Sequence, residues 1–143
     1  MNLPVVGGNV SEQAVQRSED GIVVEVGSEF LEHGKVQVHV APDGRVRVDK
    51  REQGKEDRFE GRTDEARAKQ MSATVEGLRG ATYGQRRGVP DEPRYRLRVV
   101  RDGATVAELE VWRSELEEVK ELGRIIAELS ELAQRASNGQ ALV

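Results

Sequence analysis

The sequence predicts an α+β domain in which a four- to five-stranded, mostly antiparallel sheet carries two helices on one face. Two stretches, 36–49 and 94–111, alternate apolar and polar residues around an Asp-Gly turn, a pattern typical of β-hairpins. Two others, 64–78 and 114–136, repeat apolar residues at helical spacing. Hairpin and helix therefore alternate in ββ-α-ββ-α order, and the second face of the sheet is expected to meet solvent.

The length and composition fit one domain with a thin core. A chain of 143 residues can bury one core, and its five aromatic residues (one Trp, two Tyr, two Phe) leave that core mainly aliphatic. We expect a flexible N-terminal arm over 1–20, the domain over 21–137 and a flexible tail over 138–143. Without cysteine the chain has no disulfide framework, and no apolar run is long enough to span a bilayer, so a cytoplasmic protein without membrane contact is expected.

The first strands are predicted from β-branched residues. The run 22–26 lies between two glycines and suits an initial strand. In the first hairpin, a three-residue loop of Pro-Asp-Gly with Gly44 left-handed would pair Val40 with Val46 on the core face. His39 would then lie opposite Arg47 on the solvent face, as an exposed histidine.

The next segment is strongly charged and is followed by a helix. We predict a loop over 51–62 that returns Phe59 to the core. Thr63 is then the expected N-cap of the first helix, because acidic residues follow it, where the helix dipole favours them. The expected core positions of this helix are Ala68, Met71, Val75 and Leu78.

A long Gly- and Pro-containing connection, 80–93, precedes the second hairpin and is a candidate functional loop. If the Arg101-Asp102-Gly103 turn matches the first, Leu97 lies opposite Ala107 on the core face. The other face then pairs Arg96 with Glu108 and Arg94 with Glu110.

A second helix is expected to begin at Ser114, because Ser114 and Glu117 have the spacing of a capping box. Gly123 either bends this helix or marks where a short entry turn gives way to it. Its apolar stripe consists of Leu116, Val119, Leu122, Ile126, Leu129 and Ala133, and the helix ends after Ala136.

The residues that carry enzyme chemistry are scarce, so we expect no enzyme, no metal and no cofactor. The chain has two histidines, His33 and His39, and the first reads as a turn residue. It has no serine elbow, HExxH motif or phosphate-binding loop. Its carboxylates read as a solvated surface, since nothing indicates a raised pKa among them.

One basic feature stands out in a chain of net charge −4: Arg86, Arg87 and the alternating arginines of 94–101. A nucleic-acid-associated regulator that uses this Arg-rich strand and loop is the alternative function. Carboxylates across the strand and the shortage of aromatics to stack bases disfavour it. Trp112 is expected on the same face as Arg94, where it is either a protein-binding hot spot or a local arginine stack.

The layout around Arg94-Tyr95-Arg96-Leu97-Arg98-Val99 resembles emfourin, a small bacterial inhibitor of thermolysin-like metalloproteases. The likeness covers about 36–135 and lies in the order of elements: a strand region, a short helix, a Tyr-centred strand, a paired strand and a C-terminal helix. The Gly-Gly-Phe segment associated with that family is absent, so no inhibitory residue carries over. The resemblance implies a non-enzymatic protein that acts by gripping another protein.

We therefore expect a small protein-binding module: a protease inhibitor, an immunity factor or an adaptor. It should be monomeric or weakly self-associating, because both helices need only one face of the sheet. The expected partner surface combines the 80–93 loop with the outer face of the second hairpin and comprises Tyr83, Arg86, Arg87, Arg94, Arg96, Glu110 and Trp112.

Overall fold

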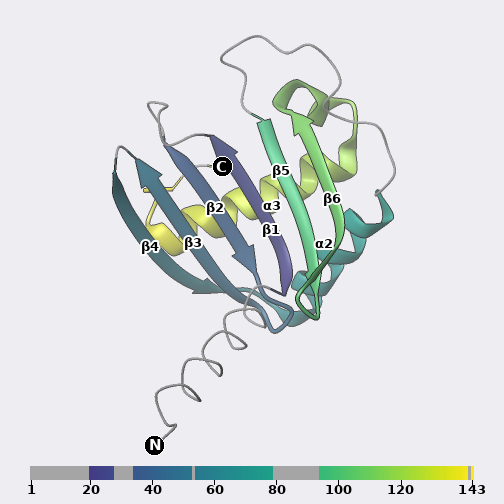
Figure 1. Cartoon of the computed structure of the whole chain (residues 1–143), viewed down its shortest axis with the longest axis horizontal. Coiled ribbons are helices and arrows are strands. Elements are labelled where there is room, and N and C mark those ends of the chain that lie inside the picture. The colour runs from purple at the N-terminus through teal and green to yellow at the C-terminus, as the bar shows by residue number, and fades with distance from the viewer. Residues whose placement is uncertain (1–19, 28–33, 53, 79–93, 142) are drawn as a thin grey trace, which may run out of the picture.

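The fold is a single antiparallel sheet with helices on one side, seen in a computed structural model that describes residues 20–27, 34–52, 54–78, 94–141 and 143 (Figure 1). The described residues form six strands, one more than the largest number expected, in the order β4-β3-β2-β1-β5-β6. Their bounds are β1 Gly21–Gly27, β2 Lys35–Val40, β3 Arg45–Glu52, β4 Lys55–Arg62, β5 Arg94–Arg101 and β6 Ala104–Trp112. The predicted α+β class is confirmed.

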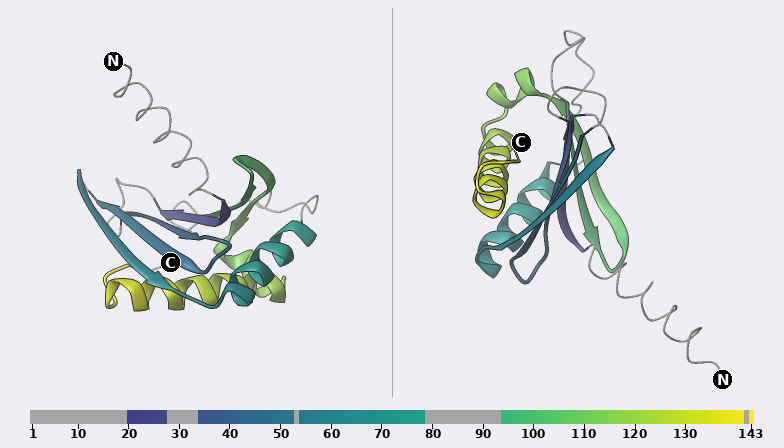
Figure 2. Two further views of the ribbon diagram at one scale, coloured as in Figure 1. Left: turned by 90° about the horizontal axis from the view of Figure 1, so that it is seen from below. Right: turned by 90° about the vertical axis from the view of Figure 1, so that its left-hand side faces the viewer.

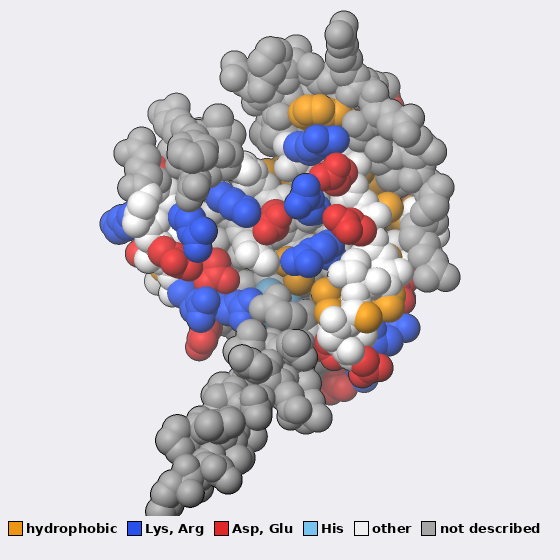
Figure 3. Space-filling model, in the orientation of Figure 1, with side chains coloured by type: hydrophobic (Ala, Val, Ile, Leu, Met, Phe, Trp, Pro, Cys, Tyr) orange, Lys and Arg blue, Asp and Glu red, His pale blue; other side chains and the backbone are white. Residues whose placement is uncertain are grey.

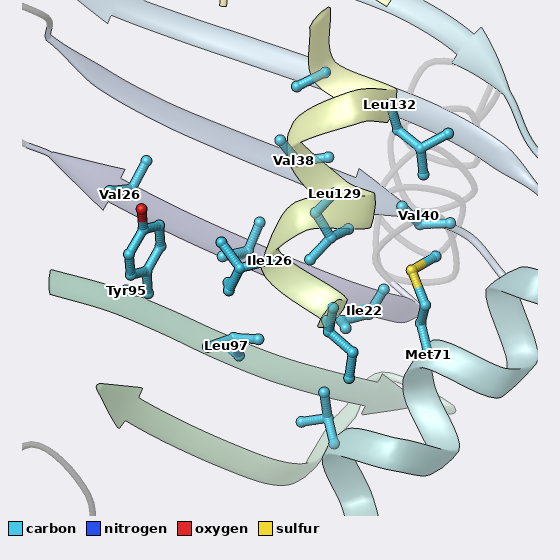
Figure 4. Packing of buried hydrophobic residues seen from close by; sticks show 14 of the residues in the cluster. Ile22, Val26, Val38, Val40, Met71, Tyr95, Leu97, Ile126, Leu129 and Leu132 are labelled. Atoms are coloured by element: carbon cyan, nitrogen blue, oxygen red, sulfur yellow. The ribbon is translucent and has the colours of Figure 1, made fainter. Parts of the chain in front are cut away.

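Helices α2 (Glu65–Gly77) and α3 (Lys120–Ser137) lie on the same side of the sheet, as the edge-on view of Figure 2 shows. The core between them is built from alternate residues of the strands and one stripe of each helix. Leu97 of β5 and Leu129 of α3 are fully buried in it, with Met71 of α2 at one end and the ring of Tyr95 at the other (Figure 4). Most of its side chains are aliphatic, as the composition predicts.

The first hairpin forms in the predicted register. Val40 pairs with Val46 and His39 with Arg47. The loop has three residues, and Gly44 has a φ of 93°, the left-handed conformation that this turn requires. The Gly44 N–H donates to the carbonyl of Ala41 at 2.9 Å, which closes the loop.

The prediction of a loop over 51–62 is wrong, because residues 51 and 52 end β3 and residues 55–62 form the edge strand β4. Phe59 pairs with Val48 and packs against the core, as expected, but it does so from a regular strand. The charge that suggested a loop is a feature of an edge strand, which has only one neighbour and exposes most of its side chains.

The second hairpin has a different register from the predicted one. Asp102 and Gly103 both have positive φ, 53° and 78°, so the turn has two residues rather than three. A bulge between Val99 and Val100 then shifts the ladder by one further residue. Leu97 consequently lies opposite Leu109 instead of Ala107.

The charged pairs of the second hairpin move with the register. Arg96 faces Glu110 rather than Glu108, and Arg94 faces Trp112 rather than Glu110. Beyond the bulge the total shift is two residues, and because side chains alternate with a period of two, the residues from Arg94 to Val99 and from Ala107 to Trp112 keep their predicted face.

The helix ends differ from the predicted ones. The N-cap of α2 is Asp64, one residue later than expected. The C-terminal helix does not begin at Ser114: a 3₁₀ turn, η1 (Arg113–Glu117), comes first, which makes the entry-turn alternative correct. The side chains of Ser114 and Glu117 lie outside the described residues; the Glu115 carboxylate accepts the Trp112 backbone N–H at 2.8 Å. Within the described part, no helix is long and apolar enough to cross a membrane.

The residues after α3 return to the sheet, although the sequence places them outside the domain. Asn138 ends the helix in a left-handed conformation. The buried Ser137 hydroxyl then accepts the N–H of Ala141 at 2.9 Å, and Ala141 is fully buried. The carbonyl of Gln140 accepts a hydrogen bond from Lys50 on β3, which fixes the direction of this segment.

Candidate functional site

The candidate site lies on the outer face of the sheet, the face turned away from both helices. Figure 3 shows this face, where blue basic and red acidic side chains alternate over the strands. The six strands form one continuous sheet, so the outward-facing side chains of all six share this face. It has two halves of different charge, one on β1, β5 and β6 and the other on β2, β3 and β4.

The first half contains four of the predicted partner-binding residues, and its organising group is the Glu110 carboxylate. One oxygen accepts hydrogen bonds from Arg96 Nε at 3.0 Å and Arg96 Nη2 at 2.8 Å. The other lies 3.3 Å from Arg94 Nη2. These contacts hold both arginines in place, and the hydrogen bond to Glu110 raises the pKa of Arg96.

Trp112 lies next to this cluster on the edge strand β6. Its ring is 5.0 Å, centroid to guanidinium carbon, from Arg94, a cation–π contact. The Trp112 side chain is half-buried, and its indole N–H is buried without a hydrogen-bond partner in the described structure. An unsatisfied buried donor is unfavourable for the fold.

This half, which we call the second-hairpin patch, is electrically neutral. Its outward-facing charged and aromatic side chains are Arg94, Arg96, Arg98, Glu25, Glu108, Glu110 and Trp112, so three cations meet three carboxylates. The Arg-rich appearance of β5 in the sequence is therefore compensated by the strands on either side of it.

The second half, which we call the basic half, carries the positive excess. On its described strands six cations, Lys35, Arg45, Arg47, Arg51, Arg58 and Arg62, face outward with three carboxylates, Asp49, Glu56 and Glu60. The basic half was not predicted, because Arg58 and Arg62 lie in a segment that was expected to be a loop. Alternating Arg45 and Arg47 in the first hairpin were the available signal.

His39 is on the predicted face but is not exposed. It retains 4% of its accessible surface, and its Nε2 lies 2.8 Å from the carbonyl oxygen of Asp20. The expectation of a surface histidine is wrong, because the ring is buried and bonded to the backbone of Asp20, immediately before β1. Among the described residues no group of three His, Asp or Glu side chains is placed to hold a metal ion.

The remaining predicted site residues, Tyr83, Arg86 and Arg87, lie outside the described residues, as do His33 and the 80–93 loop. The structure thus brings together Arg94, Arg96, Glu110 and Trp112 and leaves the contribution of the loop as a prediction.

A scan against protein-family models and a search of curated proteins both find no match to this chain. The resemblance to emfourin therefore stays an expectation from the sequence, and the function rests on the geometry of the outer face.

Proposed function

We propose that this chain is a small non-enzymatic protein-binding module that uses the second-hairpin patch and the 80–93 loop as its partner surface. An inhibitor, an immunity factor or an adaptor would all work in this way. The observation that carries the proposal is the cluster in which Glu110 fixes Arg94 and Arg96 beside the half-buried Trp112 on the sheet face turned away from α2 and α3.

The chemistry of the cluster suits a protein partner. Tryptophan and arginine are the residues most enriched in protein-binding hot spots, and fixing them in advance lowers the entropy lost on binding. A neutral pattern of alternating charges favours a partner with the complementary pattern over a generic polyanion. The alternative, a nucleic-acid-associated regulator using β5, is weakened because Glu25, Glu108 and Glu110 cancel the charge of that strand.

The second-hairpin patch is smaller than the surface that a stable interface covers, so other residues must contribute to binding. Three strands spaced about 4.8 Å apart, with about 30 Å of strand length, present a flat area of about 450 Å². A stable interface covers about 800 Å² on each partner. The 80–93 loop follows α2 and leads directly into β5, so it is the natural source of the remaining area.

The test compares Trp112→Ala and Arg94→Ala with a matched control. Arg58→Ala removes an exposed arginine from the same face, but in the other half, where it pairs with Asp49 at 2.7 Å. Immobilised full-length chain is used to capture a partner from a lysate of the source cells, and the affinity of the purified partner is then measured by calorimetry.

We expect each patch variant to weaken binding at least about fivefold, about 1 kcal/mol, and the control to leave it unchanged. Equal binding by all variants would contradict the assignment of the surface. The inhibitor form is tested separately by adding the full chain to thermolysin, where stoichiometric loss of peptidase activity is expected. Retention of full activity with excess chain would exclude inhibition of that enzyme and leave the immunity-factor and adaptor forms.

A further inference from the structure

A half-open hollow of about 480 Å³ lies at the end of the basic half, away from the second-hairpin patch. Its lining comes from the ends of β2, β3 and β4 and comprises His39, Ala41, Arg45, Val46, Arg47, Glu60, Gly61 and Arg62. Three of these side chains are arginines and one is a carboxylate. The volume lies within the range of pockets that bind small ligands.

The strand register forces two of the arginines together. Arg45 and Arg62 are directly opposite each other on β3 and β4, and both point to the outer face. Just beyond this pair, the backbone N–H of Thr63 donates to the carbonyl of Gly44 at 2.8 Å. This hydrogen bond keeps β3 and β4 paired at the position of the two arginines. Like charges directly opposite each other destabilise a sheet unless something neutralises them.

The carboxylates that the structure describes form ion pairs with only two of the three arginines that line the hollow. Asp43 binds Arg45 through a 2.8 Å contact to Nε and accepts the Arg45 backbone N–H, and these bonds with the nearby positive charges hold the pKa of Asp43 below its usual value. Arg47 is paired with Asp49 at 3.2 Å. Arg62, by contrast, has no ion pair within the described part of the chain and is exposed.

A second pair of like charges on the outer face, unlike Arg45 and Arg62, is fully neutralised. Lys35 and Arg51 also lie opposite each other, but Lys35 pairs with Glu25 at 3.4 Å and Arg51 with Glu56 at 3.5 Å. At that position the fold supplies a carboxylate to each cation. Among the described residues, Arg62 has no carboxylate of its own: Asp43, whose pKa it helps to lower, is bonded to Arg45, and Arg62 lines the hollow.

We infer that this hollow binds a small molecule through a phosphate group, with Arg62 and Arg45 as the main contacts. Arginine forks match the oxygens of a phosphate in pairs, and an anion placed between the two side chains removes the repulsion between them. The inference is independent of the proposed protein-binding function, because it uses other residues on the far half of the sheet.

The experiment uses the full chain labelled with ¹⁵N and inorganic pyrophosphate as the probe, with inorganic phosphate as the single-group comparison. Sodium chloride at matched ionic strength controls for charge screening. The variants are Arg62→Gln and Arg45→Gln. Arg98→Gln is the matched control, since Arg98 is on the same face and also has no ion pair among the described residues. Its strand, β5, is four strands from that of Arg62 and three from that of Arg45, about 19 Å and about 14 Å at ordinary strand spacing.

We expect saturable amide shifts at 39–47 and 60–62, with pyrophosphate binding more tightly than phosphate. Each hollow variant should weaken pyrophosphate binding about tenfold, the usual effect of losing a charge-assisted hydrogen bond, while Arg98→Gln changes it less than twofold. Without the anion, Arg62→Gln should melt at the same or a higher temperature than the wild type, which excludes misfolding as the cause. The inference is overturned if sodium chloride gives the same shifts, or if Arg98→Gln weakens binding as much as Arg62→Gln does.

Discussion

Gly44, in the turn of the first hairpin, offers the sharpest test of the fold. A Cβ atom at this position would stand 2.2 Å from the carbonyl oxygen of Thr63, and the backbone φ of 93° is one that side-chain-bearing residues avoid. Gly54, in the turn between β3 and β4, has a similar φ of 83° but open space where its Cβ would be. Substituting alanine at each position therefore separates the cost of conformation from the cost of a clash.

The magnitudes follow from these two terms. A left-handed alanine costs about 1–2 kcal/mol, partly offset by about 0.4–1 kcal/mol because alanine also restricts the unfolded chain. Gly54→Ala should therefore lower the free energy of unfolding by about 1 kcal/mol or less. Gly44→Ala must in addition displace Thr63, whose N–H bond to the Gly44 carbonyl contributes about 1 kcal/mol, so a total loss of about 2 kcal/mol is expected.

The assay is equilibrium unfolding in urea at 25 °C, followed by circular dichroism and by the fluorescence of the single Trp112. Unchanged denaturant slopes would show that both variants unfold between the same states as the wild type. If the two substitutions cost the same within about 0.5 kcal/mol, the close approach of Thr63 to the turn is not real.

Three further outcomes are expected. Ser137→Ala should lower the free energy of unfolding by about 1–3 kcal/mol in the same urea assay, because it leaves the buried Ala141 N–H without an acceptor. The control, Ser130→Ala on the partly exposed side of α3, should cost under about 0.5 kcal/mol. Burial raises the pKa of Tyr95, so the neutral phenol is favoured in the fold; stability should hold below pH about 10 and fall above it, and urea titrations across that range should show a smaller fall for Tyr95→Phe. Asp20→Ala removes two hydrogen bonds, at 3.1 and 3.0 Å, to the backbone of the β5–β6 turn, and hydrogen exchange should show faster exchange of those two amides with little change in the core; equal protection would refute this.

The first hairpin could be predicted to the level of its register because its turn is specified by local chemistry. Pro-Asp-Gly allows a three-residue loop with glycine at the left-handed position, and the alternating valines then permit one alignment. The second hairpin also contains Asp-Gly, but its turn spans two residues and a bulge follows at Val99 and Val100. Nothing in the local sequence distinguishes a bulge from a regular strand there, because β-branched residues fit both.

The part of the candidate site that depends only on the alternation of side chains between the two faces of a strand could be predicted from the sequence. Arg94, Arg96, Glu110 and Trp112 share a face in either register, since the register error is an even number of residues. The hollow was not predictable, because it needs Arg62 to be opposite Arg45. That pairing can be inferred only if residues 55–62 are recognised as a strand, and their many charges instead suggest a loop.

The charges of β4 also determine what its free edge can do. Two copies of β4 paired antiparallel about Arg58 would place Glu56 against Glu60 and Arg58 against its own counterpart, in both cases like against like on the outer face. Each such juxtaposition opposes the addition of a seventh strand from another copy of the chain. The charged residues that made this segment resemble a loop thus disfavour the growth of the sheet beyond β4.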